Sequence, residues 1–170
     1  ISAIMGMILT MPISSVAARV SLSIGNIPLA AGAALIGCTT QLIGFATQSF
    51  RSNNPIGKTI SVGIGTSMLY WPNIIKKPLI WLPTILSSMI LGPIGVCLLQ
   101  TTSTSAGAGM GSCGIVGQLS CIETMGISNP LTWISIVIVQ LLGSIILTSI
   151  FDFILKDKLH LYTDEDLLLK

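Results

Sequence analysis

Four long stretches of this chain contain no charged residue, and they set its pattern of hydrophobic and polar positions. These stretches cover residues 1–18, 20–50, 78–122 and 124–151. Each is long enough for an apolar helix of roughly 20 residues, the length that crosses the hydrocarbon core of a bilayer. The pattern therefore predicts four transmembrane helices, with cores at Ile1–Ala18, Pro28–Thr47, Leu79–Leu99 and Leu131–Leu155.

The segment between Lys58 and Lys76 is less apolar, and it contains Gly63, Pro72 and Asn73. Basic residues gather on the cytoplasmic side of membrane proteins. If residues 59–75 do not cross the membrane, seven of the eight basic residues share that side, and if they cross, the bias falls to five against three at best. We therefore expect residues 59–75 to form a hairpin or amphipathic segment that enters from the cytoplasmic side.

The composition excludes a soluble domain, because only 8% of the residues are charged and 51% are hydrophobic. Soluble domains have about a quarter of their residues charged. We expect an all-α polytopic membrane protein in a lipid bilayer, with about four transmembrane helices plus re-entrant segments and no nucleic-acid partner. Since the chain opens at Ile1 inside an apolar segment, we expect a fragment of a larger permease-like fold, followed by a cytoplasmic tail at residues 156–170.

The glycine-rich run from Ser105 to Gln118 satisfies the spacing G-x-G-x-x-G. In dinucleotide-binding folds this spacing follows a strand, opens a helix and precedes an acidic residue about 20 positions on. Here an apolar span precedes the glycines and no acidic residue lies near position 130. Small residues and hydroxyls instead let backbones approach each other inside a membrane. We therefore expect a re-entrant segment whose helix ends face a ligand near the midplane.

Neutral polar residues and glycines inside the apolar regions are the candidate ligand contacts, and they match an uncharged polyol better than an ion. Arg19 either reaches the outer interface or lines a pathway, and Glu123 is either a rim residue or a hydrogen-bond acceptor for substrate. The candidate substrate-binding residues are Asn26, Asn73, Thr104, Ser105, Gly107, Gly109, Gly111, Gln118 and Glu123.

Metal, cofactor and catalytic sites are not expected from this sequence. The four cysteines include no C-x-x-C pair, and the one histidine, His160, lies in the tail. Metal sites need convergent ligands, so the cysteines are interpreted as small residues of the membrane interior. The pattern is that of a transport or sensing protein without an enzyme's reactive groups.

Four runs of the sequence, in this order and spacing, resemble the EIIC-like membrane proteins of the bacterial phosphotransferase system, specifically the branch of the PfoR-type toxin regulators. The runs are Met11–Ala17, Gly25–Ala34, Pro72–Pro78, and Ser105–Gly111 with Gly117 and Gln118. The resemblance covers most of residues 8–120.

This resemblance implies that residues 1–155 are the C-terminal half of an EIIC-like domain in the bacterial cytoplasmic membrane. Such a permease component carries a sugar inward while a cytoplasmic phosphoryl-carrier subunit phosphorylates it, and it is a homodimer. Arg19, Glu123 and His160 do not align with the sugar-binding His and Glu pair of better-understood permeases. A second interpretation therefore stays open, namely a membrane-embedded regulator of gene expression that senses a ligand without transporting it.

Overall fold

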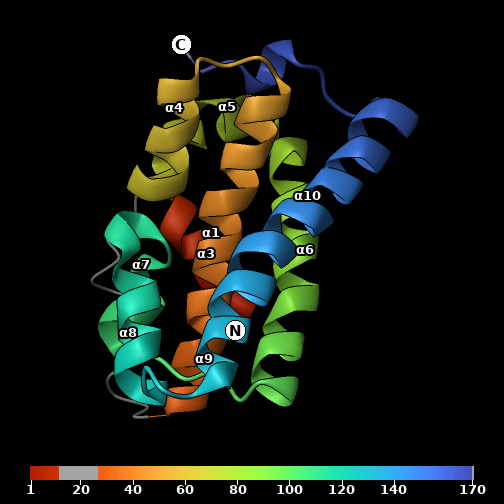
Figure 1. Ribbon diagram of the computed structural model, residues 1–170. Helices are drawn as coiled ribbons and strands as arrows, with labels where there is room; N and C mark the ends of the chain where they lie inside the picture. The colour runs from red at the N-terminus through yellow and green to blue at the C-terminus, as the bar shows by residue number, and fades with distance from the viewer. Residues whose placement is uncertain (12–26, 170) are drawn as a thin grey trace.

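The computed structural model describes residues 1–11 and 27–169, and this part of the chain is helical without a β-strand. Three of its helices are long and apolar enough to cross a membrane (Figure 1). They are α3 (Pro28–Arg51), the continuous helix Pro78–Leu98 and the continuous helix Pro130–Lys158. An all-α membrane protein, as predicted, is confirmed.

The remaining helical pieces are short, and several are joined end to end. The other α-helices are α1 (Ser2–Thr10), α4 (Ile56–Ile60), α5 (Trp71–Lys76), α6 (Leu82–Pro93), α7 (Ser105–Met110), α8 (Val116–Met125), α9 (Pro130–Ile134) and α10 (Ser144–Asp152). Wider π-helical turns cover Ser61–Gly65, Ile94–Leu98, Ser135–Gly143 and Phe153–Lys158. Tighter 3₁₀ turns cover Ser67–Tyr70, Pro78–Trp81, Cys113–Ile115 and Glu165–Leu167.

Helix α3 forms the centre of the bundle, and small or polar residues along it let its neighbours approach closely. A Cβ atom added at Gly37 would lie 1.9 Å from the carbonyl oxygen of Ser2, so α1 rests directly on the α3 backbone. Hydroxyl and amide groups connect the helices further: Thr40 and Ser144 share a hydrogen bond of 3.1 Å, and the Thr84 hydroxyl donates to Gln41 Oε1 at 2.8 Å. Close backbones and interhelical hydrogen bonds are how helices associate inside a bilayer, where apolar burial gives little driving force.

The outward face of the helix Pro130–Lys158 is apolar, as a surface in contact with lipid should be. Its exposed large side chains are Leu131, Trp133, Ile134, Val137, Ile138, Leu142, Ile145, Ile146, Ile150, Phe153 and Ile154. Only 33% of its most apolar window is buried inside the bundle, compared with 72% for α3. Helix α3 is therefore the inner helix and the helix Pro130–Lys158 a peripheral one.

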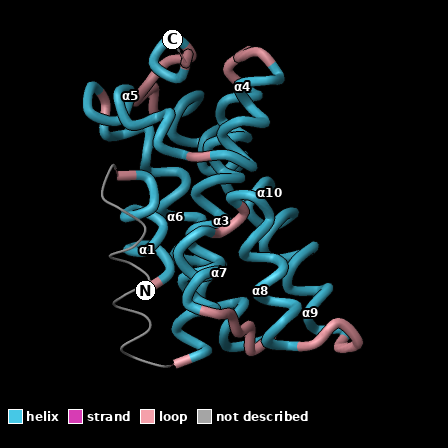
Figure 2. Tube along the Cα trace, turned by 90° about the vertical axis from the view of Figure 1, so that its left-hand side faces the viewer, coloured by secondary structure: helices cyan, strands magenta, loops and turns pink. Residues whose placement is uncertain are grey.

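Two helical hairpins lie on the same side of α3, one above the other (Figure 1). The first hairpin comprises residues 56–76, with α4 and α5 as its arms, and the second comprises residues 105–125, with α7 and α8 as its arms. The tube in Figure 2 shows that α4 and α5 lie at one end of the bundle, whereas α8 leads to the opposite end. Neither hairpin crosses the bundle.

Three of the four predicted spans coincide with the long helices. Of the fourth, Ile1–Ala18, the structure describes only residues 1–11, which include α1, so its full length stays a prediction. The expected hairpin at residues 59–75 is present, since Lys58 and Asn73, one on each arm, both contact residues 166–169 at the same end of the molecule.

A candidate binding site where two re-entrant hairpins meet

The tips of the two hairpins meet beside the middle of α3. The Ser112 hydroxyl of the second hairpin donates a hydrogen bond of 2.9 Å to the carbonyl oxygen of Gly63 in the first. A Cβ at Gly63 would lie 3.1 Å from the Cβ of Ala46, and Gly111 lies against Cys38 and Thr39. We call the place defined by Thr39, Gly63, Gly111 and Ser112 the hairpin junction.

Gly111 makes the turn of the second hairpin possible. Its φ of +57° lies in the left-handed region, where residues with a Cβ are strained. A Cβ here would also lie 2.7 Å from both the carbonyl carbon of Cys38 and the backbone nitrogen of Thr39. The turn is closed by the Gly117 amide, which donates to the Gly111 carbonyl oxygen at 2.8 Å. The glycine run thus brings bare backbone into contact with α3.

Hydroxyl side chains hold the two arms of the second hairpin together. Thr104 precedes α7; its oxygen accepts from the Gly107 amide at 3.3 Å, and its hydroxyl donates to Ser120 Oγ at 3.0 Å. Nearer the open end, the Thr124 hydroxyl donates to the carbonyl oxygen of Thr102 at 2.9 Å. These pairs join the two arms from positions 102 and 124 to positions 111 and 117, so the predicted hairpin is present.

Several buried polar atoms around the tip of the second hairpin have no hydrogen-bond partner within the part of the chain that the structure describes. They are Thr39 Oγ1, Gln118 Oε1 and Gln140 Nε2. The two glutamines are linked by one bond of 3.3 Å, from Gln118 Nε2 to Gln140 Oε1. A buried polar group without a partner costs about 1–3 kcal/mol, so such atoms point to water or a ligand. Together they offer a hydroxyl, an amide acceptor and an amide donor, the groups that pair with hydroxyls.

The hairpin junction carries no charge, since almost all charged residues that the structure describes lie at the end of the bundle that holds the tail. There Arg51 Nε lies 2.9 Å from Asp152 Oδ2, Lys77 Nζ lies 2.6 Å from Asp166 Oδ2, and Lys156 pairs with Asp164. Glu123, exposed on α8, is the exception. A neutral junction suits an uncharged ligand better than an ion.

The predicted site residues fall into two places. Thr104, Ser105, Gly107, Gly109, Gly111 and Gln118 lie together on the second hairpin, with Glu123 on the same helix as Gln118 but exposed. Asn73 lies elsewhere, at the open end of the first hairpin, where its side-chain amide donates to the carbonyl oxygens of Asp166 and Leu168 at 2.8 and 3.0 Å. Asn26 falls outside the described residues.

Sequence reasoning missed Thr39 and Ser112 of the hairpin junction, and it also missed Gln140, which bonds Gln118. Gln140 carried a usable signal, because a glutamine between Val139 and Leu141 in an apolar span is costly unless it faces a partner or cavity. Thr39 carried none, since a hydroxyl in a helix usually bonds its own backbone. Ser112 is one more small hydroxyl residue in a glycine-rich run. Within the described residues, no group of three or more His, Cys, Asp or Glu is placed to hold a metal ion.

Apolar helices of membrane length, combined with interrupted helices that meet inside the bundle, define a helical membrane protein and are typical of transporters. The comparison with protein families agrees with this class. The chain belongs to the family described as "Phosphotransferase system, EIIC", whose model matches residues 1–169. No curated protein and no solved structure matches the chain.

Membership of this family fixes the general role. An EIIC domain is the membrane transport component of a sugar phosphotransferase system, as distinct from its catalytic phosphoryl-carrier domains, so a sugar substrate and partner components of that system are implied. The match does not separate the PfoR-type branch from other EIIC proteins.

Proposed function

We propose that this chain forms the sugar-binding half of a permease component of the phosphoenolpyruvate-dependent phosphotransferase system in the bacterial cytoplasmic membrane. The observation that carries the proposal is the hairpin junction, where two hairpin tips meet beside neutral polar atoms that have no partner among residues 1–11 and 27–169. Interrupted helices of this kind form the midplane sites of many transporters, because their free backbone groups and small residues can surround a ligand.

The sugar would lie against the second hairpin, where Gln118 and Thr39 supply hydrogen bonds to its hydroxyl groups. Thr104, Ser105, Gly107 and the other glycines of this hairpin shape the site rather than bind by charge, and Glu123 serves at the rim. This division of roles follows from burial, because Gln118 is 8% exposed whereas Glu123 is exposed. A neutral, mostly buried set discriminates sugars through the number and direction of their hydroxyls.

The end of the bundle that carries Arg51, Lys58, Lys76, Lys77 and Lys156 is proposed to face the cytoplasm, in line with the positive-inside rule. A sugar released from the hairpin junction toward this end would meet the phosphoryl-carrier subunit there. The chain is further proposed to work in a multi-pass homodimer, as the resemblance to EIIC proteins implies.

The test uses the complete gene and a panel of labelled sugars. Uptake into cells with and without the gene identifies the sugar, and equilibrium binding of that sugar to the purified protein is then measured for Thr39→Val. This variant keeps the side-chain shape and removes the hydroxyl, so binding should weaken about tenfold. The matched control is Thr47→Val, whose hydroxyl bonds the Ile43 carbonyl oxygen at 2.8 Å on the apolar flank of α3.

Equal binding by the two threonine variants would contradict the proposed site. Sugar binding without any uptake would favour the regulator over the permease, since a sensor needs the site and not the turnover.

A further inference from the structure

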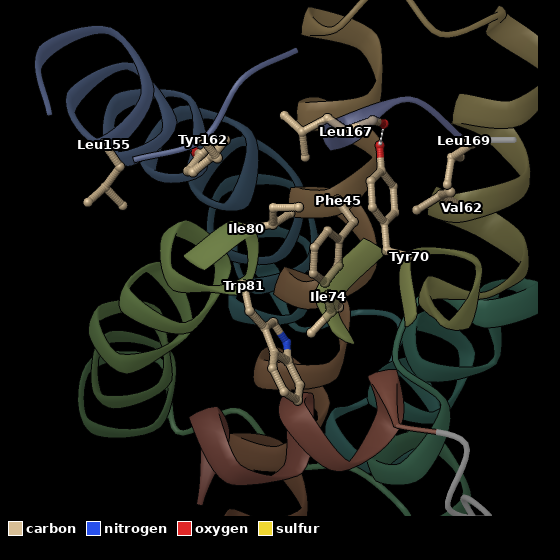
Figure 3. Close-up of a cluster of buried hydrophobic side chains, with 10 residues drawn as sticks. All are labelled: Phe45, Val62, Tyr70, Ile74, Ile80, Trp81, Leu155, Tyr162, Leu167 and Leu169. Atoms are coloured by element: carbon tan, nitrogen blue, oxygen red, sulfur yellow. Dashed lines mark hydrogen bonds between the residues drawn. The ribbon is translucent and has the colours of Figure 1, made fainter. Parts of the chain in front are cut away.

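The chain after the helix Pro130–Lys158 returns across the open end of the first hairpin (Figure 3). We call residues 161–169 the C-terminal strap. Its first anchor is Tyr162, which is 1% exposed and whose hydroxyl donates to Asp152 Oδ1 at 2.6 Å. Asp152 is itself buried and paired with Arg51, so this end of the strap is attached to α3 and α10.

The backbone of the strap is bound by side chains from the first hairpin and the loop before it. Before and on the first arm, the Asn54 amide donates to the Leu167 carbonyl oxygen at 2.9 Å, and Lys58 donates to that of Leu169. On the second arm, the Tyr70 hydroxyl donates to the same Leu167 oxygen at 3.1 Å (Figure 3). The Asn73 side-chain amide donates to the carbonyl oxygens of Asp166 and Leu168. The Leu169 amide donates back to Asn54 Oδ1 at 3.0 Å.

Side chains at the end of the strap, from Leu167 to Leu169, alternate between buried and exposed positions. Leu167 is 0% exposed and Leu169 is 9% exposed, whereas Leu168 between them is 41% exposed. Leu167 and Leu169 belong to the same buried cluster as Phe45, Val62 and Tyr70 (Figure 3). Backbone hydrogen bonds combined with pockets for alternate side chains are how proteins bind an extended peptide. After the 3₁₀ turn Glu165–Leu167, the first hairpin therefore holds residues 167–169 in the manner of a bound peptide.

One ion pair adds to these contacts on the second arm. Lys77 Nζ lies 2.6 Å from Asp166 Oδ2, and the same oxygen accepts from the backbone amide and hydroxyl of Thr163, each at 2.9 Å. The strap is thereby joined to Asn54 and Lys58 on one side and to Tyr70, Asn73 and Lys77 on the other.

We propose that the C-terminal strap is an intramolecular latch that clamps the two arms of the first hairpin and so holds its tip against the second hairpin. Release of the strap lets the arms separate and withdraws Gly63 from Ser112. A partner that displaces the strap would be an extended peptide with apolar residues two positions apart, like Leu167 and Leu169. The contacts between the strap and the first hairpin do not depend on any sugar. An effect of the strap on sugar binding rests on the proposed function.

The test measures hydrogen–deuterium exchange of residues 56–76 in the full-length purified protein, with Leu167→Asp and Leu168→Asp as a matched pair. Burying a carboxylate at position 167 should eject the strap and raise exchange in the first hairpin about tenfold, because its arms then open locally. The same change at the exposed position 168 should leave exchange unaltered. Equal exchange in the two variants would overturn the latch.

A milder variant covers the case in which Leu167→Asp does not fold. Tyr70→Phe removes only the hydroxyl that contacts the strap, because the ring keeps its stacking on Phe45, with centroids 5.0 Å apart. Faster exchange at residues 56–76 in Tyr70→Phe supports the latch, and wild-type exchange there contradicts it. Since this readout needs no sugar, failure to bind any sugar would count against the proposed function and leave the latch intact.

Discussion

Ser112 Oγ lies 2.9 Å from the carbonyl oxygen of Gly63, and this hydrogen bond joins two hairpins that enter the bundle from opposite ends. Gly63 lies in a π-helical turn that ends at Gly65, and Thr66 after it is extended, so the Gly63 carbonyl is close to a break in the helix. The bond fixes the position of one hairpin tip against the other.

Replacing Ser112 by alanine should separate the tips without unfolding the bundle. The loss of one buried hydrogen bond leaves the Gly63 carbonyl unpaired, a cost of about 1–3 kcal/mol. Exchange of the amides in residues 61–67 should therefore accelerate, and binding of the transported sugar should weaken about tenfold. The control is Ser61→Ala, because the Ser61 hydroxyl bonds the Gly57 carbonyl oxygen at an exposed position. Identical exchange in both variants would show that the bond does not hold the junction.

Replacing Gly111 by alanine should destabilise the second hairpin much more. The added Cβ meets the α3 backbone at 2.7 Å, in a left-handed conformation that alanine avoids. We expect a loss of about 3 kcal/mol or more in the free energy of unfolding, measured by titration with a denaturing detergent. Gly57→Ala is the matched control, since nothing lies within 4 Å of a Cβ there. That helical position should gain about 0.5–1 kcal/mol, and a tolerated Gly111→Ala would refute the close approach.

The transmembrane spans could be predicted from the sequence, because bilayer thickness determines their length and apolar content. Leu79–Leu99 and Pro28–Thr47 each match a long helix within a few residues at each end. The hairpin shape of residues 105–118 was also predictable, since glycines and hydroxyls replace the charges of a free loop. The local pattern of apolar, small and polar residues shows how each segment can lie in lipid, and it is sufficient to predict each span and each hairpin.

The pairing of the hairpins and the packing of the tail were not predictable. The contact between Ser112 and Gly63 joins residues far apart in sequence, and neither residue type is unusual in its own segment. Asn73 was expected near substrate because a polar residue in an apolar region draws attention, yet its amide binds the strap backbone. The leucines at 167 and 169 are too few to show a periodicity, so residues 156–170 were expected to be a simple polar tail.

Acidification should release the C-terminal strap. The hydrogen bond from Lys77 holds the pKa of Asp166 below its usual value, and Lys156 does the same for Asp164. A lowered folded-state pKa means that each pair stabilises the docked strap above the unfolded carboxyl pKa of about 3.9. That stabilisation is lost as the pH falls through the folded-state pKa. Besides Lys77, the charged residues that line the small cavity beside Asp166 are Lys76 and Glu165.

Spin-label mobility at Leu168→Cys follows this release, because position 168 is exposed while the strap is docked. Mobility should stay low from neutral pH to about pH 5 and rise below about pH 4. A variant that also carries Asp166→Asn should be more mobile at neutral pH and respond less to acid. A wild-type spectrum that does not change between neutral pH and pH 3 would contradict the role of these carboxylates.

The start of the first hairpin and the C-terminal segment that contacts both of its arms should be accessible from one side of the membrane. Pro55 and His160 are exposed at the end of the bundle that carries the basic residues and the strap, whereas Ile127 lies exposed in the loop between α8 and α9 at the opposite end. Single cysteines at positions 55 and 160, in a background without native cysteines, should react with a membrane-impermeant reagent only from the cytoplasm. A cysteine at position 127 should react only from outside. Reaction of positions 55 and 160 from different sides would mean that residues 56–76 cross the membrane, which the shared contacts of Lys58 and Asn73 with residues 166–169 forbid.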